Sequence, residues 1–565
     1  MNIHLCFVII TFGAMAVSCR EQPSKPFIAV NLVGYQTDAP KQALLINHDS
    51  ETFEIVHADR DEVVLKGITG LKKPPDSASG DQVSIIDFSL FGEAGKYYIR
   101  TISSDTIRSY PFAIAHDIYR DGLDLSLRSF YFHRCGTKVG NAAEWHYEAC
   151  HLDDAPFYDD SDSRRDVSGG WHDAGDYNKF TVNTTLSAAM LLYLFELQED
   201  YFTDGQLQIP ESGNGKPDLL DEISYALRWL LKMQRSDGAV YHKVSQKWWI
   251  GEFLPHNDPA ERYLFEISTA ATASFTAVSA LGARLYGLYD PDFSAELKQA
   301  SLMGWEFLQT NPVIQPIGGF MNPPDVYGGE YGDSDDRDER LWASIELYRL
   351  TGNEILLNYF LNNHALLLRQ FQPLSWKNVH SLCLAAFFAA RLEEQFPHEH
   401  LKLKEAWIDH GDRILHNRKR NNYQNLIRHT EYYWGSNSVG LAYAFDLIQL
   451  HMLTGKKMYY NAALDQLHFI LGRNPVNLSQ ITGAGSRSVH HPYHQLSEMG
   501  NFGVPVAGML VGGPNNHVLL RNRKISAYPA KNYEDSFKNY YVNEPAINFT
   551  AIFSYVIGYY VIHEP

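Results

Sequence analysis

Two aspartates stand three residues apart in a glycine-containing segment of this 565-residue chain. The segment reads Gly-Gly-Trp-His-Asp-Ala-Gly-Asp and carries Asp173 and Asp176. Glycines allow the backbone to approach closely, and two carboxylates at this spacing in a turn can converge on one water molecule. Taken alone, such a pair is more typical of a turn or a calcium loop. A catalytic role requires a partner elsewhere in the chain.

A third carboxylic acid lies near the C-terminus, in Asn543-Glu544-Pro545-Ala546. The simplest interpretation is that Asn543 caps the last helix and Glu544 supplements its first turn. That position favours the ionised carboxylate, which is a difficulty for a general acid. Glu544 would need burial or a neighbouring carboxylate, such as Asp535, to retain its proton.

Two thiols and two imidazoles occur close to the aspartate pair, at Cys135, Cys150, His151 and His172. In an exported protein, a disulfide between the two cysteines is the default expectation. The four side chains together are also the ligand types that suit tetrahedral zinc. Their spacing is not that of a standard zinc finger, so the residues alone leave both interpretations open.

The elements that must position these residues fall into two regions. Between residues 27 and 114, short β-rich runs separated by turns predict a small β-sandwich, with strands near 27–31, 43–46, 53–56, 63–65, 83–88, 97–100 and 111–114. We therefore place a domain boundary near residue 116.

Beyond that boundary the apolar period changes from two to about 3.6, which predicts helices. Twelve stretches show it, near 121–134, 185–198, 217–234, 268–288, 293–310, 338–350, 353–370, 379–394, 401–416, 437–454, 457–472 and 544–561. Twelve helices can close into a double ring of hairpins or form an open solenoid. Periodicity alone does not choose between them.

Composition narrows the class of partner. The net charge is -18 and the pI is about 5.7, which disfavours nucleic acid and anionic membrane surfaces. Aromatic residues make up 13% of the chain, and their rings can stack on the apolar faces of sugars. A neutral carbohydrate therefore fits best, although most of these aromatic side chains are expected in the core.

The first eighteen residues are almost wholly apolar, carry no charged side chain and precede Cys19. This pattern predicts an export signal, and Ala-Val-Ser-Cys resembles a bacterial lipoprotein signal whose cysteine receives the lipid. A single transmembrane anchor is the alternative. We expect an exported protein held at Cys19 on an outer membrane or cell surface, or otherwise periplasmic or secreted, with no further membrane contact.

Several motifs in a fixed order resemble glycoside hydrolase family 9, in the group with an N-terminal immunoglobulin-like domain. The likeness runs from about Asn31 to Tyr560. Its carriers are Asn31-Leu-Val-Gly-Tyr35, Asp166-Val-Ser-Gly-Gly-Trp-His-Asp-Ala-Gly-Asp176, Pro217-Asp-Leu-Leu-Asp-Glu222, Trp434-Gly-Ser-Asn437, Leu471-Gly-Arg-Asn-Pro475, Val511-Gly-Gly-Pro514 and Asn543-Glu544. The resemblance implies a signal peptide at 1–19, an immunoglobulin-like β-sandwich at 20–116 and an (α/α)6 barrel at 117–565.

The resemblance also implies roles for individual residues. Asp176 matches the general base, Asp173 helps to hold the attacking water, and Glu544 matches the general acid of an inverting enzyme. Related members bind structural zinc through residues that match Cys135, Cys150, His151 and His172. Some bind calcium in the loop that matches Ser334, Asp335, Asp338 and Glu339. No organic cofactor is implied.

The chain departs from the family in its substrate-binding motif, which ordinarily ends Pro-His-x-Arg. Here Tyr493 replaces the histidine, Gln495 replaces the arginine, and His494 occupies the variable position. Glutamine offers two donors and an acceptor where arginine offers a charged fork with five donors. We therefore expect a sugar other than plain cellulose. Trp248, Trp249 and Trp434 are candidate stacking surfaces.

The sequence thus predicts a monomeric, inverting hydrolase of β-linked polysaccharides or oligosaccharides, similar to endoglucanases. One alternative is an exo-acting hydrolase on another β-linked sugar, such as glucosamine or xyloglucan fragments. A second is a non-catalytic glycan-binding lipoprotein. Retention of Asp173, Asp176 and Glu544 argues against that second alternative.

Overall fold

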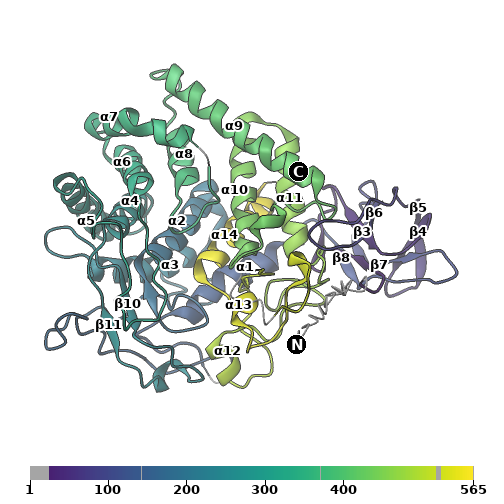
Figure 1. The fold of residues 1–565 in the computed structure, drawn as a ribbon, viewed down its shortest axis with the longest axis horizontal. Helices are drawn as coiled ribbons and strands as arrows, with labels where there is room; N and C mark the ends of the chain where they lie inside the picture. Colours follow the sequence, from purple (N-terminus) through teal and green to yellow (C-terminus); the bar gives the residue numbers. More distant parts are fainter. Residues whose placement is uncertain (1–23, 142, 370, 517–523, 564–565) are drawn as a thin grey trace, which may run out of the picture.

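A β domain and a larger helical domain lie side by side in the computed structural model (Figure 1), which describes residues 24–141, 143–369, 371–516 and 524–563. The predicted export signal and Cys19 lie outside the described residues. Among the residues that are described, no helix combines the length and the apolar character needed to cross a membrane.

The β domain consists of two sheets packed face to face. One has the strand order β1-β3-β6 and the other β2-β8-β7-β4-β5. All pairs are antiparallel except β2 with β8. The strands are β1 (Phe27–Ala29), β2 (Gly34–Tyr35), β3 (Gln42–Ile46), β4 (Thr52–His57), β5 (Glu62–Ile68), β6 (Val83–Asp87), β7 (Gly95–Thr101) and β8 (Phe112–Ile114).

Alternating side chains of these strands build the sandwich core, which includes Leu45, Ile55, Ile86, Ile99 and Phe112. One face of each sheet is thereby removed from water, as the period-two pattern predicts. All seven predicted strands are present. The two-residue β2 was not predicted, because it is too short to show an alternation.

The helical domain contains all twelve predicted helices. They are α1 (Arg120–Ser129), α2 (Thr181–Leu197), α3 (Asp218–Met233), α4 (Thr269–Tyr286), α5 (Pro291–Thr310), α6 (Arg337–Thr351), α7 (Glu354–Asn363), α8 (His380–Ala389), α9 (Pro397–Arg420), α10 (Ser436–Thr454), α11 (Lys457–Ile470) and α14 (Ile547–Ile562). Two short helices, α12 (Gln495–Met499) and α13 (Tyr540–Asn543), were not predicted.

Six helices close an inner ring, because α2, α4, α6, α8, α10 and α14 contact one another in that order and α14 returns to α2. The outer helices α1, α3, α5, α7, α9 and α11 each pack against an inner helix (Figure 1). Inner helices are apolar or small on nearly all sides; in α4, every residue except Arg284 is buried. The closed double ring is confirmed and the solenoid is excluded.

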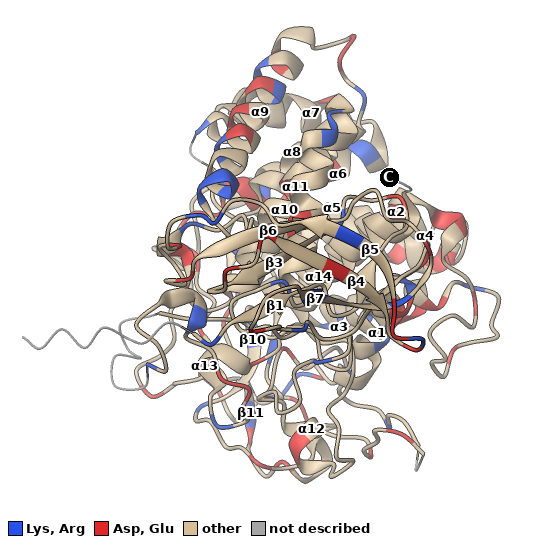
Figure 2. Ribbon diagram, turned by 90° about the vertical axis from the view of Figure 1, so that its right-hand side faces the viewer, with Lys and Arg blue, Asp and Glu red and all other residues tan. Residues whose placement is uncertain are grey.

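Outer helices show the opposite surface pattern. In α9, charges of both signs lie along the helix (Figure 2), and its buried residues form one narrow stripe: Leu403, Trp407, His410, Gly411, Ile414 and Leu415. This is the pattern of a helix with one face in solvent. Loops and a small sheet, β9 (Lys179–Phe180), β10 (Lys243–Gln246) and β11 (Arg262–Leu264), cover one end of the ring.

Buried polar contacts join the two domains. The Asn31 side chain lies 3.0 Å from Nδ1 of His468, and Nε2 of Gln36 donates to the carbonyl of Tyr560 at 2.8 Å. Nζ of Lys531 lies 2.7 Å from the carboxylate of the fully buried Asp81. The β domain is therefore fixed against the last part of the chain.

Candidate active site

Asp173 and Asp176 lie on a buried turn that precedes β9 and then α2, an inner-ring helix. Only 1% and 5% of their surfaces are exposed. Gly175 allows a close backbone approach here, because a Cβ at this position would lie 2.0 Å from the carbonyl oxygen of Tyr493. The amide of Gln495 donates to the carbonyl of Gly175 at 3.0 Å. The segment 493–495 therefore packs against the turn and bonds to it, in addition to the chain connection between the turn and α2.

Glu544 approaches the same turn from the end of the chain. It follows α13 and precedes α14, which begins at Ile547 rather than at residue 544. Glu544 is therefore not in the first turn of the last helix, and Asn543 does not cap that helix; the simplest interpretation of these residues was wrong. The amide of Ile547 donates to the carbonyl of Asp173 at 2.9 Å, so adjacent inner helices bring the three acids together.

The acids border a pocket of about 400 Å³ whose walls are largely aromatic. Asp176 and Glu544 line it with Ala174, Phe180, Trp249, Gly329, Tyr331, Trp434, Tyr493, Tyr540 and Tyr541. A few polar groups in a mostly apolar hollow are typical of a ligand site. Aromatic walls suit the flat apolar faces of sugar rings.

Burial of three carboxyl groups together changes their proton affinities. Burial, and then repulsion from Asp176, raises the pKa of Asp173 to about 8. Burial raises the pKa of Asp176 to about 6, opposed by a hydrogen bond from the Asn178 amide. Burial, followed by repulsion from the two aspartates, raises the pKa of Glu544 well above its ordinary value. One site therefore combines a protonated acid with an aspartate that ionises more readily than its neighbour.

Asp535 does not contribute to this proton retention. Its carboxylate accepts the amide hydrogens of His490 and His491 at 2.8 Å each, and it contacts the side chain of Asn543 at 3.3 Å. The prediction that Asp535 holds the proton on Glu544 is wrong, because the neighbouring carboxylates that act on Glu544 are Asp176 and Asp173. Asp535 instead fixes the segment that leads to Tyr493.

Two further residues hold Asp173 and were not found in the sequence. Nδ2 of Asn183 donates to one carboxylate oxygen at 2.9 Å, and the hydroxyl of Tyr331 donates to the other at 3.1 Å. Lys243 anchors the loop that carries Tyr331, since its Nζ donates to the Asn322 side chain at 2.6 Å and to the Gly329 carbonyl at 2.8 Å. Burial lowers the pKa of Lys243 to about 7.

The three residues of the altered substrate-binding motif, Tyr493, His494 and Gln495, lie in different surroundings. Tyr493 lines the catalytic pocket and stacks on Phe537, with ring centroids 5.1 Å apart. His494 is buried against His133 and contacts the Ser497 hydroxyl at 2.8 Å, so it does not face the pocket. Gln495 is also buried, with its side-chain oxygen 3.4 Å from the amide nitrogen of Phe253. Of the three residues of this motif, Tyr493 lines the catalytic pocket, whereas His494 and Gln495 do not.

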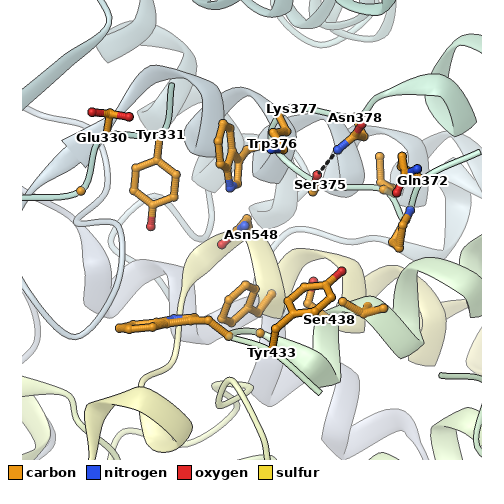
Figure 3. Close-up of a pocket in the computed structure, with 17 residues that line it drawn as sticks. Glu330, Tyr331, Gln372, Ser375, Trp376, Lys377, Asn378, Tyr433, Ser438 and Asn548 are labelled. Carbon is orange, nitrogen blue, oxygen red and sulfur yellow. Dashed lines mark hydrogen bonds between the residues drawn. The ribbon is translucent and has the colours of Figure 1, made fainter. Parts of the chain in front are cut away.

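A second hollow, of about 610 Å³, continues from the catalytic pocket and shares Gly329, Tyr331 and Trp434 with it. In Figure 3, Tyr331 and Trp376 face Tyr433 across this hollow, with Asn548 between them. Trp434 is 42% exposed, as a stacking surface requires. A glycan chain can thus extend beyond the three acids.

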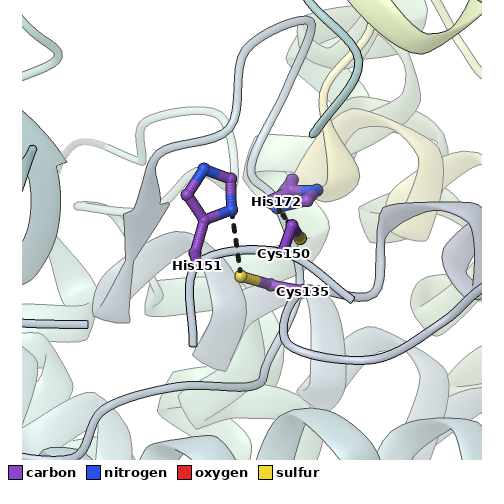
Figure 4. Close-up of side chains that lie close together, drawn as sticks. All are labelled: Cys135, Cys150, His151 and His172. Carbon is purple, nitrogen blue, oxygen red and sulfur yellow. Dashed lines mark hydrogen bonds between the residues drawn. The ribbon is translucent and has the colours of Figure 1, made fainter. Parts of the chain in front are cut away.

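Cys135, Cys150, His151 and His172 form one compact cluster (Figure 4), with their ligand atoms all within 4.8 Å of one another. Both cysteines are free, so the disulfide expected by default is not formed. Sγ of Cys135 lies 3.7 Å from Nδ1 of His151, and Sγ of Cys150 lies 3.8 Å from Nε2 of His172. Two thiols and two imidazoles around one point fit tetrahedral zinc.

The predicted calcium ligands separate into two groups. Ser334 is exposed, and Asp335 forms an ion pair with Arg337. Asp338 and Glu339 are buried, and neither carboxylate oxygen of Glu339 accepts a hydrogen bond from a described donor. Asp333, which the sequence did not single out, joins them; burial raises the pKa of Asp333 and of Asp338 to about 6. Oδ2 of Asp333 likewise has no donor among the described residues, whereas Asp338 accepts the amide hydrogen of Val379.

A closed double ring of helices with buried acids beside an aromatic pocket is an arrangement suited to a glycoside hydrolase, and the comparisons place the chain in that class. The sequence model of glycosyl hydrolase family 9 matches residues 119–557, and that of the cellulase N-terminal Ig-like domain matches residues 24–106. The chain belongs to glycosyl hydrolase family 9. It is an inverting, endoglucanase-like enzyme that hydrolyses β-glycosidic bonds.

Similar proteins support this class. Endoglucanase D of Acetivibrio thermocellus is 31% identical over 94% of this chain and 83% of its own length. A xyloglucan-specific endo-β-1,4-glucanase of Bacteroides ovatus is 30% identical over 95% of each chain. The crystal structure of a metagenome-derived family 9 endoglucanase superposes with a TM-score of 0.87 at 33% identity, covering 95% of this chain and 99% of its own.

Proposed function

We propose that Asp176 is the general base, that Glu544 is the general acid, and that Asp173 helps to hold the attacking water. The observation that carries this assignment is the burial of three neighbouring carboxyl groups, of which Asp176 and Glu544 line one pocket. Glu544 keeps its proton and can give it to the leaving oxygen, while ionised Asp176 can take a proton from water on the other side of the bond.

The variant Glu544→Gln tests this assignment and the non-catalytic alternative together. It should lower kcat by about 100-fold or more, because a positioned acid contributes about that much, while glycan affinity is retained. Glu534→Gln is the matched control, since Glu534 is exposed on the same segment. Glycan binding without turnover in both the wild type and Glu544→Gln would instead indicate a glycan-binding lipoprotein.

The proposed substrate is a β-linked glucan cut within the chain, with unsubstituted cellulose disfavoured. The hollow that continues past the catalytic pocket supports internal cleavage, and Tyr493 gives this part of the pocket an aromatic wall. The xyloglucan-specific relative makes xyloglucan a natural test substrate. Product sizing on β-glucans, xyloglucan and glucosamine oligosaccharides should give fragments of mixed length; one short product would indicate the exo-acting alternative.

A structural zinc ion bound by Cys135, Cys150, His151 and His172 is also proposed. Nε2 of His151 lies 3.3 Å from the Asp258 carboxylate, an outer contact typical of zinc-bound histidine. A related family 9 endoglucanase has been described as a Zn-binding triple mutant. Because His172 directly precedes Asp173, fixing its ring also fixes the catalytic turn.

Calcium is proposed at the buried acids Asp338 and Glu339 together with the partly buried Asp333. A cation there would offset the cost of crowding three carboxyl groups, whose burial raises their pKa values. Calcium should therefore raise the melting temperature of the wild type, and Glu339→Gln should remove most of that increase. An equal increase in both proteins would exclude the site.

The location proposed from the sequence is the outer membrane or cell surface, with a lipid on Cys19 and the enzyme acting as a monomer. Cys19→Ser should release the protein from the membrane fraction without changing its specific activity. Membrane association that persists in this variant would favour the transmembrane alternative. Light scattering of the mature protein tests the monomer.

A further inference from the structure

Two aromatic rings lie stacked on each other outside the catalytic pocket. The centroids of Trp248 and Tyr327 are 4.1 Å apart and their planes differ by 26°. Each side chain is nevertheless 56% exposed, so one face of each ring is covered by its partner while much of the remaining surface meets water. Exposed apolar groups that are held together in this way mark interaction sites more often than isolated ones do.

Backbone contacts fix this pair relative to the pocket. Nε1 of Trp249 donates to the carbonyl of Tyr327 at 2.9 Å, and the amide of Tyr327 donates to the carbonyl of Lys247 at 2.8 Å. Trp249 itself lines the pocket that contains Asp176 and Glu544. Tyr327, the stacking partner of Trp248, is thus hydrogen-bonded to a residue of the pocket wall, which places the pair beside that wall.

The surroundings fit an uncharged ligand. Lys247 is the nearest cation in the sequence, and its Nζ lies 3.3 Å from the Asp325 carboxylate, so the two charges offset each other. The pair Trp248 and Tyr327 therefore offers apolar faces without a dominant charge. A β-linked glucose unit presents flat C–H faces of this kind, with its hydroxyl groups directed outward.

We propose that Trp248 and Tyr327 form a sugar-binding platform for a unit of the β-linked glucan that lies outside the catalytic pocket. The inference rests on the proposed function and adds to it: the platform makes the enzyme favour glycan chains long enough to reach it. The occupant is the same chain that is cleaved, because the platform is continuous with the pocket through Trp249.

Chain-length dependence tests the platform. We would measure kcat/KM for a long and a short oligosaccharide of a glucan that the wild type hydrolyses. Trp248→Ala should lower the value about tenfold for the long substrate, as expected for loss of one aromatic contact, and leave the short one unchanged. Trp248→Phe should retain most of the preference. Tyr110→Ala, which removes an exposed aromatic side chain from the β domain, is the matched control.

The possible results test the platform and the proposed substrate separately. If Trp248→Ala left the ratio of kcat/KM for the long and the short substrate unchanged, the platform would be overturned. An equal loss of kcat/KM on both substrates would also overturn it, because such a loss would indicate that the substitution disturbs Trp249 in the catalytic pocket. A wild type that cleaves no β-linked glucan would instead overturn the proposed substrate, and the platform with it.

Discussion

Replacing Asp173 with asparagine should stabilise the folded protein, and by a larger amount as the pH rises. The pKa of Asp173 is raised from 3.8 to about 8 by burial and by repulsion from Asp176. The unfolded chain therefore releases this proton near pH 4, whereas the folded protein keeps it. Between these values the unfolded state binds fewer protons, so the free energy of unfolding of the wild type falls as pH rises.

The magnitude follows from the size of the shift. Each pH unit within this window costs about 1.4 kcal/mol, so the three units between pH 4 and pH 7 correspond to at most ~4 kcal/mol. Asparagine does not titrate, and its amide can keep contacts with Asn183 and Tyr331 because the tyrosine hydroxyl can also accept. For a domain of roughly 450 residues, ~2–4 kcal/mol is a rise in melting temperature of about 2–4 °C.

Thermal unfolding between pH 4 and pH 8 measures this difference. Asp173→Asn and the wild type should melt at similar temperatures at pH 4 and diverge steadily above it. Asp159→Asn, which changes an exposed aspartate of the same domain, should show no such divergence. A difference for Asp173→Asn that is independent of pH, or that shrinks as pH rises, would refute the reasoning that burial keeps this carboxyl protonated.

Two further outcomes follow from the geometry. Asp535→Asn should leave the alkaline limb of the pH–rate profile of hydrolysis in place, because Asp535 does not act on Glu544; a shift of that limb would restore a direct role. His151→Ala should lose zinc, measured by metal analysis, and melt several degrees lower, whereas exposed His146→Ala should do neither. Full stability and activity after zinc removal would contradict the structural role.

The sequence predicted elements better than boundaries. All seven predicted strands and all twelve predicted helices are present, because half-buried strands and helices repeat their apolar residues with different periods, whereas the short β2, β9, β10, β11, α12 and α13 were not predicted. Closure of the helices into a ring could not be predicted from the apolar pattern, because inner helices such as α4 are apolar or small on nearly every side. Their sequences therefore do not show which face contacts which neighbour. The start of α14 was placed too early because Asn543 and Glu544 imitate a helix cap.

The site was predictable only where a local motif marks it. Asp173, Asp176 and the zinc cluster lie in short segments whose residue types suggest chemistry. Tyr331 contacts Asp173 although the two residues are 158 positions apart in the sequence, and no local sequence pattern predicts such a contact. Likewise, Gln495 stood out because its residue type was unusual, but residue type does not show that its side chain is buried.

The contact between Asp81 and Lys531 bears on the order in which contacts between the two domains can form during synthesis. The carboxylate belongs to the first domain to be synthesised and is fully buried in the complete protein, and its cationic partner follows 450 positions later. At about 5–20 residues per second, the ribosome needs roughly 20–90 seconds to supply that partner. Until then the Asp81 carboxylate has partners only within the β domain, Ser24 and Asn47, because Tyr423 and Lys531 belong to the helical domain. The full set of contacts to this carboxylate therefore forms only after the helical domain has been synthesised.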